Sequence, residues 1–257
     1  MLNIIKSDLY RLKKSKLFYS FVVLTGLIPF LLMILNRQDI RLGISVFGKL
    51  TTFITADDVI KIGIEYQKGL GIIVALLVSV FISQEYLWNT WQHKWLISKS
   101  RIGIYLSKTI LASLTSTILF LLFETVAFLF SGQIKELFTS EYIAIVVSGS
   151  FLYATLGAVT CLVAMLIKNS TMSAIVSLCY ILFSENLATI VLNISSIFDT
   201  TAKLGVWCVQ HSIYGISSII CSAPNATDIL FPVMVNSLSI IGIAVFVGIL
   251  IFHRYEL

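Results

Sequence analysis

The sequence predicts an all-α protein, a polytopic helical membrane protein with six transmembrane helices. Hydrophobic residues make up 58% of the 257 residues and charged residues only 12%, whereas a soluble domain carries about 25% charged residues. Several uncharged runs are long enough to cross about 30 Å of hydrocarbon as helices that rise about 1.5 Å per residue. Runs of this length favour helices over a membrane β-barrel, whose strands are about ten residues long.

The first sixteen residues (1–16) predict an amphipathic helix that leads into the first span. Ile5, Leu9 and Leu12 recur at helical spacing, and basic residues fill much of the remainder. Such a helix can lie on anionic head groups. Because Lys and Arg near the ends of spans favour the cytoplasmic side, the dense basic cluster at 11–16 predicts a cytoplasmic N-terminus. With six spans the C-terminus is cytoplasmic too.

Six apolar runs follow this helix, and the second is expected to begin earlier than its apolar run, near Ile60 or Ile64. No repeat, linker or low-complexity segment divides the chain, so residues 1–257 are expected to form a single transmembrane domain. The loops at 36–63 and 203–231 are expected on the outer side. The predicted spans are Leu17–Leu35, Gly69–Ser83, Ile104–Phe130, Tyr142–Ile167, Met172–Leu192 and Met234–Phe252.

The segment Leu204–Ser222 is apolar enough to compete as a seventh span. Gln210 and His211 lie at its centre, and polar side chains in a lipid-exposed span are unfavourable. A re-entrant or interfacial helix pair on the outer face is therefore expected before the last span. Cys208 and Cys221 fall in this region, and their spacing leaves a disulfide between them open.

A polar, basic interruption between the second and third spans is the most informative stretch of the chain. Leu87, Trp88, Trp91 and Trp95 fall on one side of a helix over this loop, and polar residues cover the rest. An amphipathic helix between two spans, at the membrane surface, is a place where a partner can exert force. The loop therefore indicates a membrane protein that is driven by another chain.

The sequence does not favour an enzyme. It contains no His-Glu-x-x-His pair, no Gly-x-Ser-x-Gly turn and no Gly-x-x-x-x-Gly-Lys-Ser/Thr loop, which are signatures of zinc, acyl-transfer and phosphate-binding sites. We therefore expect no catalytic residue, no metal site and no cofactor in this chain. The net charge of +5 is small and uneven, so nucleic-acid binding is not expected either.

Two carboxylates fall within predicted spans, Glu124 in the third and Glu185 in the fifth. Ionisable groups inside spans are functional candidates because a bare charge in lipid is unfavourable. One interpretation is that both line a substrate path or a proton relay. The alternative is that each is a protonated packing residue that hydrogen-bonds a neighbouring helix.

The layout resembles the permease subunits of type-2 ABC exporters, which are short, six-spanning and begin with a basic amphipathic helix. In that family the loop after the second span typically begins with Glu, has Thr five residues later, and continues with Ser-Arg and a Lys entering span three. This sequence carries Glu85, Thr90, Ser100-Arg101 and Lys108 at these positions. The opening Ser7–Lys16 is most similar to the Gram-positive branch that handles lantibiotic and bacitracin-type peptides.

The resemblance implies that residues 85–101 form a coupling helix in a groove of a separate ATPase dimer, which would hold ATP and magnesium. It implies coupling roles for Glu85, Trp88, Thr90, Trp91, Trp95 and Arg101. It also implies a second permease subunit, identical or related, in a bacterial plasma membrane, and an amphipathic substrate such as an antimicrobial peptide. The alternatives are a proton-coupled secondary transporter that uses Glu124 and Glu185, a non-transporting scaffold or sensor subunit, and a membrane enzyme.

Overall fold

The computed structural model describes residues 2–37, 43–44, 51–52, 61–88, 90, 101–131, 139–196, 199–223 and 225–254. These residues are almost entirely helical, apart from a two-residue antiparallel pair of β1 (Gly43–Ile44) and β2 (Thr51–Thr52). The helices are α1 (Leu2–Lys14), α2 (Lys16–Arg37), the 3₁₀ turn η1 (Tyr66–Lys68), α4 (Leu70–Leu87), α6 (Arg101–Ser131), α7 (Ser140–Ile167), α8 (Ser170–Ser196), α9 (Asp199–Gln210), α10 (Ile213–Ser222) and α11 (Ala226–Arg254).

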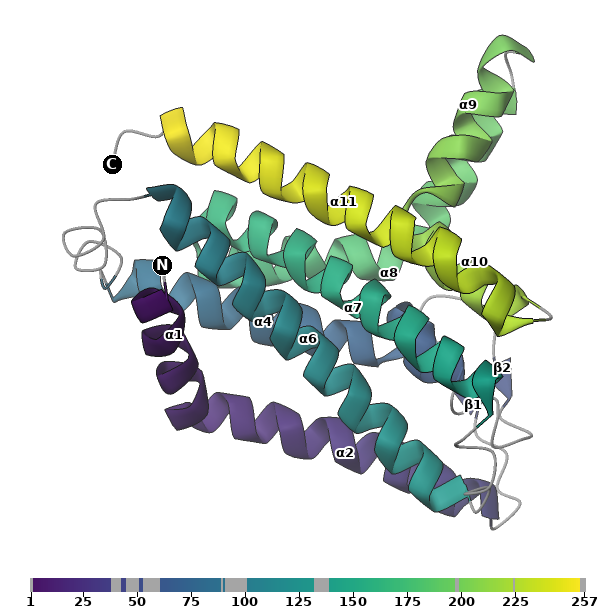
Figure 1. The fold of residues 1–257 in the computed structure, drawn as a ribbon, viewed down its shortest axis with the longest axis horizontal. Coiled ribbons are helices and arrows are strands. Elements are labelled where there is room, and N and C mark those ends of the chain that lie inside the picture. Colours follow the sequence, from purple (N-terminus) through teal and green to yellow (C-terminus); the bar gives the residue numbers. More distant parts are fainter. Residues whose placement is uncertain are drawn as a thin grey trace.

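Six helices are long and apolar enough to cross a membrane: α2, α4, α6, α7, α8 and α11. This agrees with the six predicted spans and is compatible with a multi-pass membrane protein. The six helices run roughly side by side, and the start of α1 lies at the same end of the bundle as the end of α11 (Figure 1). We call this end the terminal end and the opposite end, where β1 and β2 lie, the distal end.

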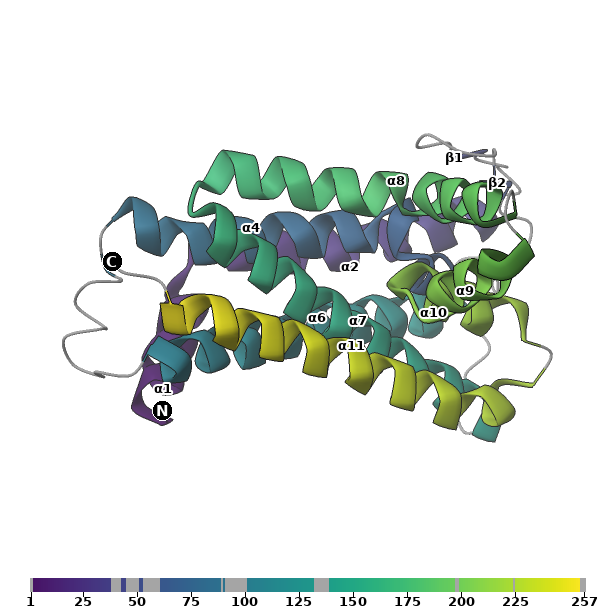
Figure 2. The same cartoon turned by 90° about the horizontal axis from the view of Figure 1, so that it is seen from above.

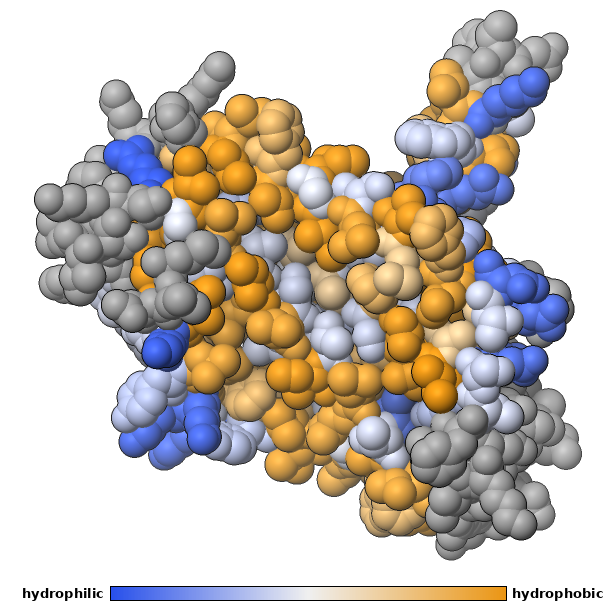
Figure 3. All heavy atoms as spheres, in the orientation of Figure 1, coloured by the Kyte–Doolittle hydropathy of each residue, from blue (hydrophilic) through white to orange (hydrophobic). Residues whose placement is uncertain are grey.

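Hydropathy varies along the bundle, and burial differs from helix to helix. Hydrophobic residues cover the middle of the bundle, whereas hydrophilic residues gather towards its two ends (Figure 3). Helices α4, α6 and α7 are the most buried of the six, while α2, α8 and α11 are largely exposed. Helix α7 lies between α8 and α11 (Figure 2). The core is therefore formed around α4, α6 and α7.

Small residues allow these central helices to approach closely. A Cβ added to Gly149 of α7 would overlap the ring of Phe120, and one added to Gly157 would lie 2.5 Å from Ser116 Oγ. Helix packing in membranes commonly depends on such small residues. Between α4 and α8, two serine pairs serve the same purpose: Ser79 with Ser177 at 3.2 Å, and Ser83 with Ser173 at 2.9 Å.

The amphipathic N-terminal helix is present as α1, and it ends at Lys14 where the sequence had suggested Lys16. Ser15 interrupts the helical path, and its side chain accepts a hydrogen bond from the Phe18 amide at 3.5 Å, near the start of α2. The predicted apolar stripe divides between two environments. Leu12 is buried against the bundle, whereas Leu9 is half exposed.

The second span begins later than expected. A helical turn at 61–64 is separated from α4 by η1 and by Gly69, whose φ of 165° and ψ of −65° interrupt the helix. The expectation that the span starts near Ile60 or Ile64 is therefore wrong, because this backbone break divides the apolar sequence. Helix α4 begins at Leu70 and continues through Leu87, so it includes Glu85.

The segment before the last span is a bent helix pair. Its helices, Lys203–Gln210 and Ile213–Ser222, meet at an angle of 79°. The break falls at His211 and Ser212, where the Ser212 side chain caps α10 by accepting from the Gly215 amide at 3.1 Å. Helix α9 projects from the side of the bundle (Figure 1). Cys208 and Cys221 are free thiols in this structure.

The close packing of α6 against α7 predicts a large difference between two glycine substitutions. Gly157→Ala places a methyl group 2.5 Å from Ser116 Oγ and 2.6 Å from the Ala112 carbonyl oxygen. Overpacking of this kind costs about 1–3 kcal/mol. In Gly242→Ala, by contrast, the new methyl group meets nothing within 4 Å. Thermal unfolding in detergent should show a lower midpoint for Gly157→Ala only, and equal midpoints would contradict this packing.

Candidate functional site: a buried charge cluster at the terminal end

Three helices meet at the terminal end and bring four charged side chains together. Asp8 and Arg11 lie three residues apart on α1, Glu85 lies in the last turn of α4, and Lys108 lies in the third turn of α6. Asp8, Glu85 and Lys108 are at most 1% exposed, and the Arg11 side chain is 27% exposed. We call these four residues the four-charge cluster.

One carboxylate oxygen joins the cluster. Glu85 Oε1 lies 2.6 Å from Arg11 Nη1 and also forms an ion pair with Lys108 Nζ. Lys108 Nζ in turn lies 2.9 Å from Asp8 Oδ2. Lys108 therefore bridges the carboxylates of α1 and α4, and Glu85 bridges the cations of α1 and α6. Two carboxylates and two cations leave the cluster with no net formal charge.

Arg11 makes two further contacts with α4. Its Nη2 donates to the Phe81 carbonyl oxygen at 2.8 Å, and its guanidinium lies 4.0 Å from the centre of the Phe81 ring. The first contact satisfies a guanidinium donor, and the second is a cation–π interaction, which is stronger where water is excluded. Arg11 is therefore held by both the backbone and the side chains of α4.

The energetics of the cluster are asymmetric. Burying a charge is unfavourable by several kcal/mol, and a buried ion pair only offsets that penalty when its geometry is good. Removing one partner, however, leaves an uncompensated buried charge and costs about 3–5 kcal/mol. The cluster thus links the positions of α1, α4 and α6, because displacing one helix separates buried charges, whatever the net contribution of the cluster to stability.

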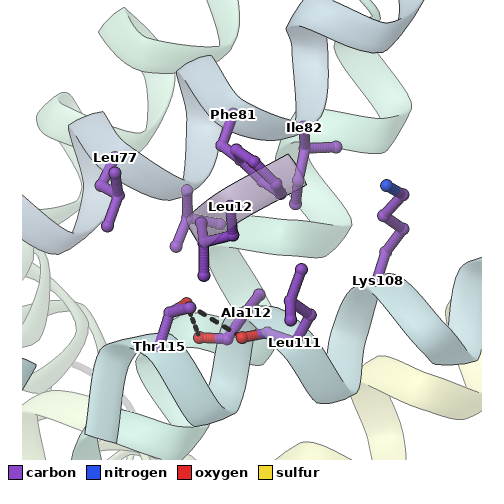
Figure 4. A pocket seen from close by; sticks show the side chains of 9 residues that line it. Leu12, Leu77, Phe81, Ile82, Lys108, Leu111, Ala112 and Thr115 are labelled. Atoms are coloured by element: carbon purple, nitrogen blue, oxygen red, sulfur yellow. Dashed lines mark hydrogen bonds between the residues drawn. The ribbon is translucent and has the colours of Figure 1, made fainter. Parts of the chain in front are cut away.

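Apolar side chains close the space beside the cluster. A cavity of about 10 Å³ lies between α1, α4 and α6, and it is lined mainly by Leu12, Leu77, Phe81 and Leu111, with Lys108 at its edge (Figure 4). This is about the size needed for one water molecule. The cavity beside the cluster therefore has no room for a molecule larger than water.

The structure places several predicted coupling residues beside the cluster. Glu85 belongs to it, and the Thr90 hydroxyl donates to the Glu85 carbonyl oxygen at 3.4 Å. Trp88 follows the end of α4 and is 60% exposed. Arg101 is the first residue of α6. Trp91 and Trp95 lie outside the described residues, so a coupling helix over 85–101 stays a prediction.

Asp8 was missed by sequence reasoning, and Arg11 was assigned roles only in orientation and in contact with anionic head groups. The ion pairs Asp8–Lys108 and Arg11–Glu85 each join residues more than 70 positions apart, so no local sequence pattern reveals them. One signal was available: Asp8 is the only acidic residue in a helix that otherwise carries basic residues. An acidic side chain there weakens attraction to anionic lipid, and in the structure Asp8 instead pairs with Lys108 of α6.

The two intramembrane candidates have different environments. Glu124 is 1% exposed on α6, and neither of its side-chain oxygens has a hydrogen-bond partner among the described residues. Glu185 is exposed on α8, which is itself largely exposed. The structure thus buries one carboxyl in the bundle and leaves the other on its surface, so the two are not brought into one cluster.

Within the described part of the chain, no group of three or more His, Cys, Asp or Glu residues could hold a metal ion. A comparison with protein-family models finds no match, and a comparison with curated proteins finds none either. Any conclusion about function therefore depends on the sequence pattern, on the fold and on the four-charge cluster.

The cluster predicts that Lys108→Met lowers stability by about 3–5 kcal/mol, because the buried carboxylates of Asp8 and Glu85 both lose their ion pair with Lys108. Adding Asp8→Asn restores neutrality and should recover part of the loss. Lys6→Met removes the same charge from an exposed position of α1 and is the matched control. Thermal unfolding of the purified protein measures all three. A loss in the control as large as that in Lys108→Met, or a double variant no better than Lys108→Met, would contradict the cluster.

Proposed function

We propose that this chain is the membrane-spanning permease subunit of an ATP-driven exporter of the ABC type, and that force enters it beside the four-charge cluster. The observation that carries the proposal is the position of this cluster. It joins α1 to α4 and α6, the two helices that flank the polar loop at 88–100. A partner that displaces this loop therefore acts on three helices at once.

The proposed assembly places the terminal end, with both termini, on the cytoplasmic side of a bacterial plasma membrane. A separate ATPase dimer supplies ATP and magnesium and binds residues 85–101. A second permease subunit, identical or related, completes the complex within the bilayer. In agreement with the resemblance in residues 84–108, the substrate is an amphipathic molecule, most simply an antimicrobial peptide of the lantibiotic or bacitracin type. The chain itself performs no covalent chemistry in this proposal.

A proton-coupled transporter is the second candidate, and the buried Glu124 is the observation that favours it. A relay requires successive groups between which protons can move. Glu185 is exposed on α8, so it does not continue a relay from Glu124 within this chain. Glu124 is equally suited to a substrate path, and the ATP-driven exporter therefore accounts for more of the structure.

Partner binding is tested with two exposed tryptophans. Trp88 at the terminal end and Trp207 on α9 are 60% and 57% exposed, so replacing either leaves the core intact. Loss of an aromatic anchor from an interface costs about 2 kcal/mol or more, or roughly thirtyfold in affinity. Trp88→Ala should therefore reduce the amount of ATPase subunit that copurifies from native membranes and the ATP turnover of the complex, whereas Trp207→Ala should change neither.

The same experiment can reject the proposal. If no ATPase subunit copurifies with the unmodified chain, and no ATP turnover accompanies it, the chain is not an ABC permease. If the ATPase is present but Trp88→Ala and Trp91→Ala both retain it fully, the loop after α4 is not its binding site.

The orientation gives a separate prediction. In a cysteine-free background, a cysteine at Asn89 should react with a membrane-impermeant thiol reagent only after cells are opened. A cysteine at Lys61, which is exposed near the distal end, should react in intact cells. The reverse pattern would place the termini outside and exclude a cytoplasmic ATPase as the partner of this loop.

A further inference from the structure

The segment directly before α4 is buried inside the distal end of the bundle, although it is not part of a span. Ile62, Ile64 and Tyr66 are at most 4% exposed. Short connecting segments usually run over the surface, because a buried one must satisfy its own backbone polar groups. Residues 61–68 therefore need partners within the bundle.

Two hydroxyl groups supply those partners from two different helices. The Tyr153 hydroxyl on α7 donates to the Gly63 carbonyl oxygen at 2.6 Å, and the Ser217 hydroxyl on α10 donates to the Ile64 carbonyl oxygen at 3.1 Å. All four residues are buried. Beyond its own short helical turns, the segment is thus held to the bundle by side chains of α7 and α10, and these contacts can break without unfolding either helix.

Further along the segment, α8 provides a third attachment. Gln67 Nε2 donates to Ser184 Oγ at 2.9 Å, while Glu65 and Lys68 form an ion pair with each other. Ser184 also lines a cavity of about 140 Å³ between α8 and the α9–α10 pair. The attachment point of Gln67 on α8 therefore lies at the edge of this cavity, which is lined by α8, α9 and α10 and not by the segment itself.

The inner side of the segment covers Glu124. A Cβ added to Gly63 would overlap Glu124 Oε1 and would lie 2.9 Å from the Phe123 ring, so the carboxyl group is in direct contact with the Gly63 backbone. No described residue donates a hydrogen bond to this carboxyl. Withdrawal of residues 61–68 would expose it at the distal end.

Helix α4 connects this segment to the four-charge cluster. Its 18 residues span about 27 Å, with residues 61–68 directly before its first turn and Glu85 in its last turn. A largely buried helix moves as a rigid body over such a length. Displacement of α4 would act on residues 61–68 through its first turn, where a Cβ added to Gly71 would overlap the Tyr66 carbonyl group.

We propose that residues 61–68 are a plug that closes the distal end over Glu124, and that displacement of α4 at the four-charge cluster withdraws it. This proposal rests on the proposed function only for the force that displaces α4. In the withdrawn state Glu124 faces the distal opening, where it becomes the anionic group of an outward path. The seated plug and its attachment to α4 are properties of this chain alone.

The plug is tested by the reactivity of one buried cysteine. Ile64→Cys is introduced after the four native cysteines are replaced, and the chain is placed in lipid nanodiscs, where a charged thiol reagent reaches both faces. Lys61→Cys, three residues earlier and exposed, is the matched control. Ile64→Cys should react at least tenfold more slowly than Lys61→Cys. Tyr153→Phe or Ser217→Ala should each accelerate Ile64→Cys about fivefold, as expected for one lost hydrogen bond.

Transmission through α4 is tested by combining Ile64→Cys with a cluster variant at the terminal end. Arg11→Gln, chosen because Arg11 is partly exposed and the variant should fold, is expected to accelerate labelling, while Lys6→Met is not. Equal reactivity of Ile64→Cys and Lys61→Cys, or no response to Tyr153→Phe and Ser217→Ala, would overturn the plug. A response to those two but not to Arg11→Gln would overturn the transmission. Neither result depends on an ATPase, so failure of the proposed function is distinguishable.

Discussion

Glu85 Oε1, shared between Arg11 and Lys108, is the contact on which the terminal end of the bundle depends. Charges at 1% exposure are tolerated only with partners of opposite sign. Each of the three helices contributes at least one charge. Loss of α4 would separate Arg11 from Glu85, loss of α6 would separate Asp8 from Lys108, and loss of α1 would reduce the cluster to the Glu85–Lys108 pair. An N-terminal helix that could have been a passive anchor on the membrane surface is thereby fixed to the start of a polar loop.

This constraint gives α4 its central role. The helix is held at the terminal end by charges, along its length by serine pairs with α8, and at the distal end by the buried segment that precedes it. Hydroxyl pairs and small residues permit close approach without large interlocking side chains. The helix is thus attached by polar contacts at both ends and along its length.

The sequence predicted the helical class and the six long apolar helices well, because a span requires about 20 apolar residues in succession. It did not predict where the second span begins, since the break at Gly69 depends on backbone angles. It singled out Glu85 and Lys108 through the family resemblance, but it did not pair them with Asp8 and Arg11. Those pairs join helices that are far apart in the sequence, and the periodicity within one helix does not indicate which other helix it contacts. It named Glu124 and Glu185 together, while only the fold distinguishes a buried carboxyl from an exposed one.

Hydrogen exchange measured by mass spectrometry tests most directly whether the four-charge cluster makes the three helices one unit. Groups that open cooperatively share one opening free energy. The account predicts that amides in α1, in the last turns of α4 and in the first turns of α6 have a common opening free energy, and that it falls together in all three when Arg11 is replaced by Gln. Fast, independent exchange of α1, with α4 and α6 unaffected by the replacement, would contradict it.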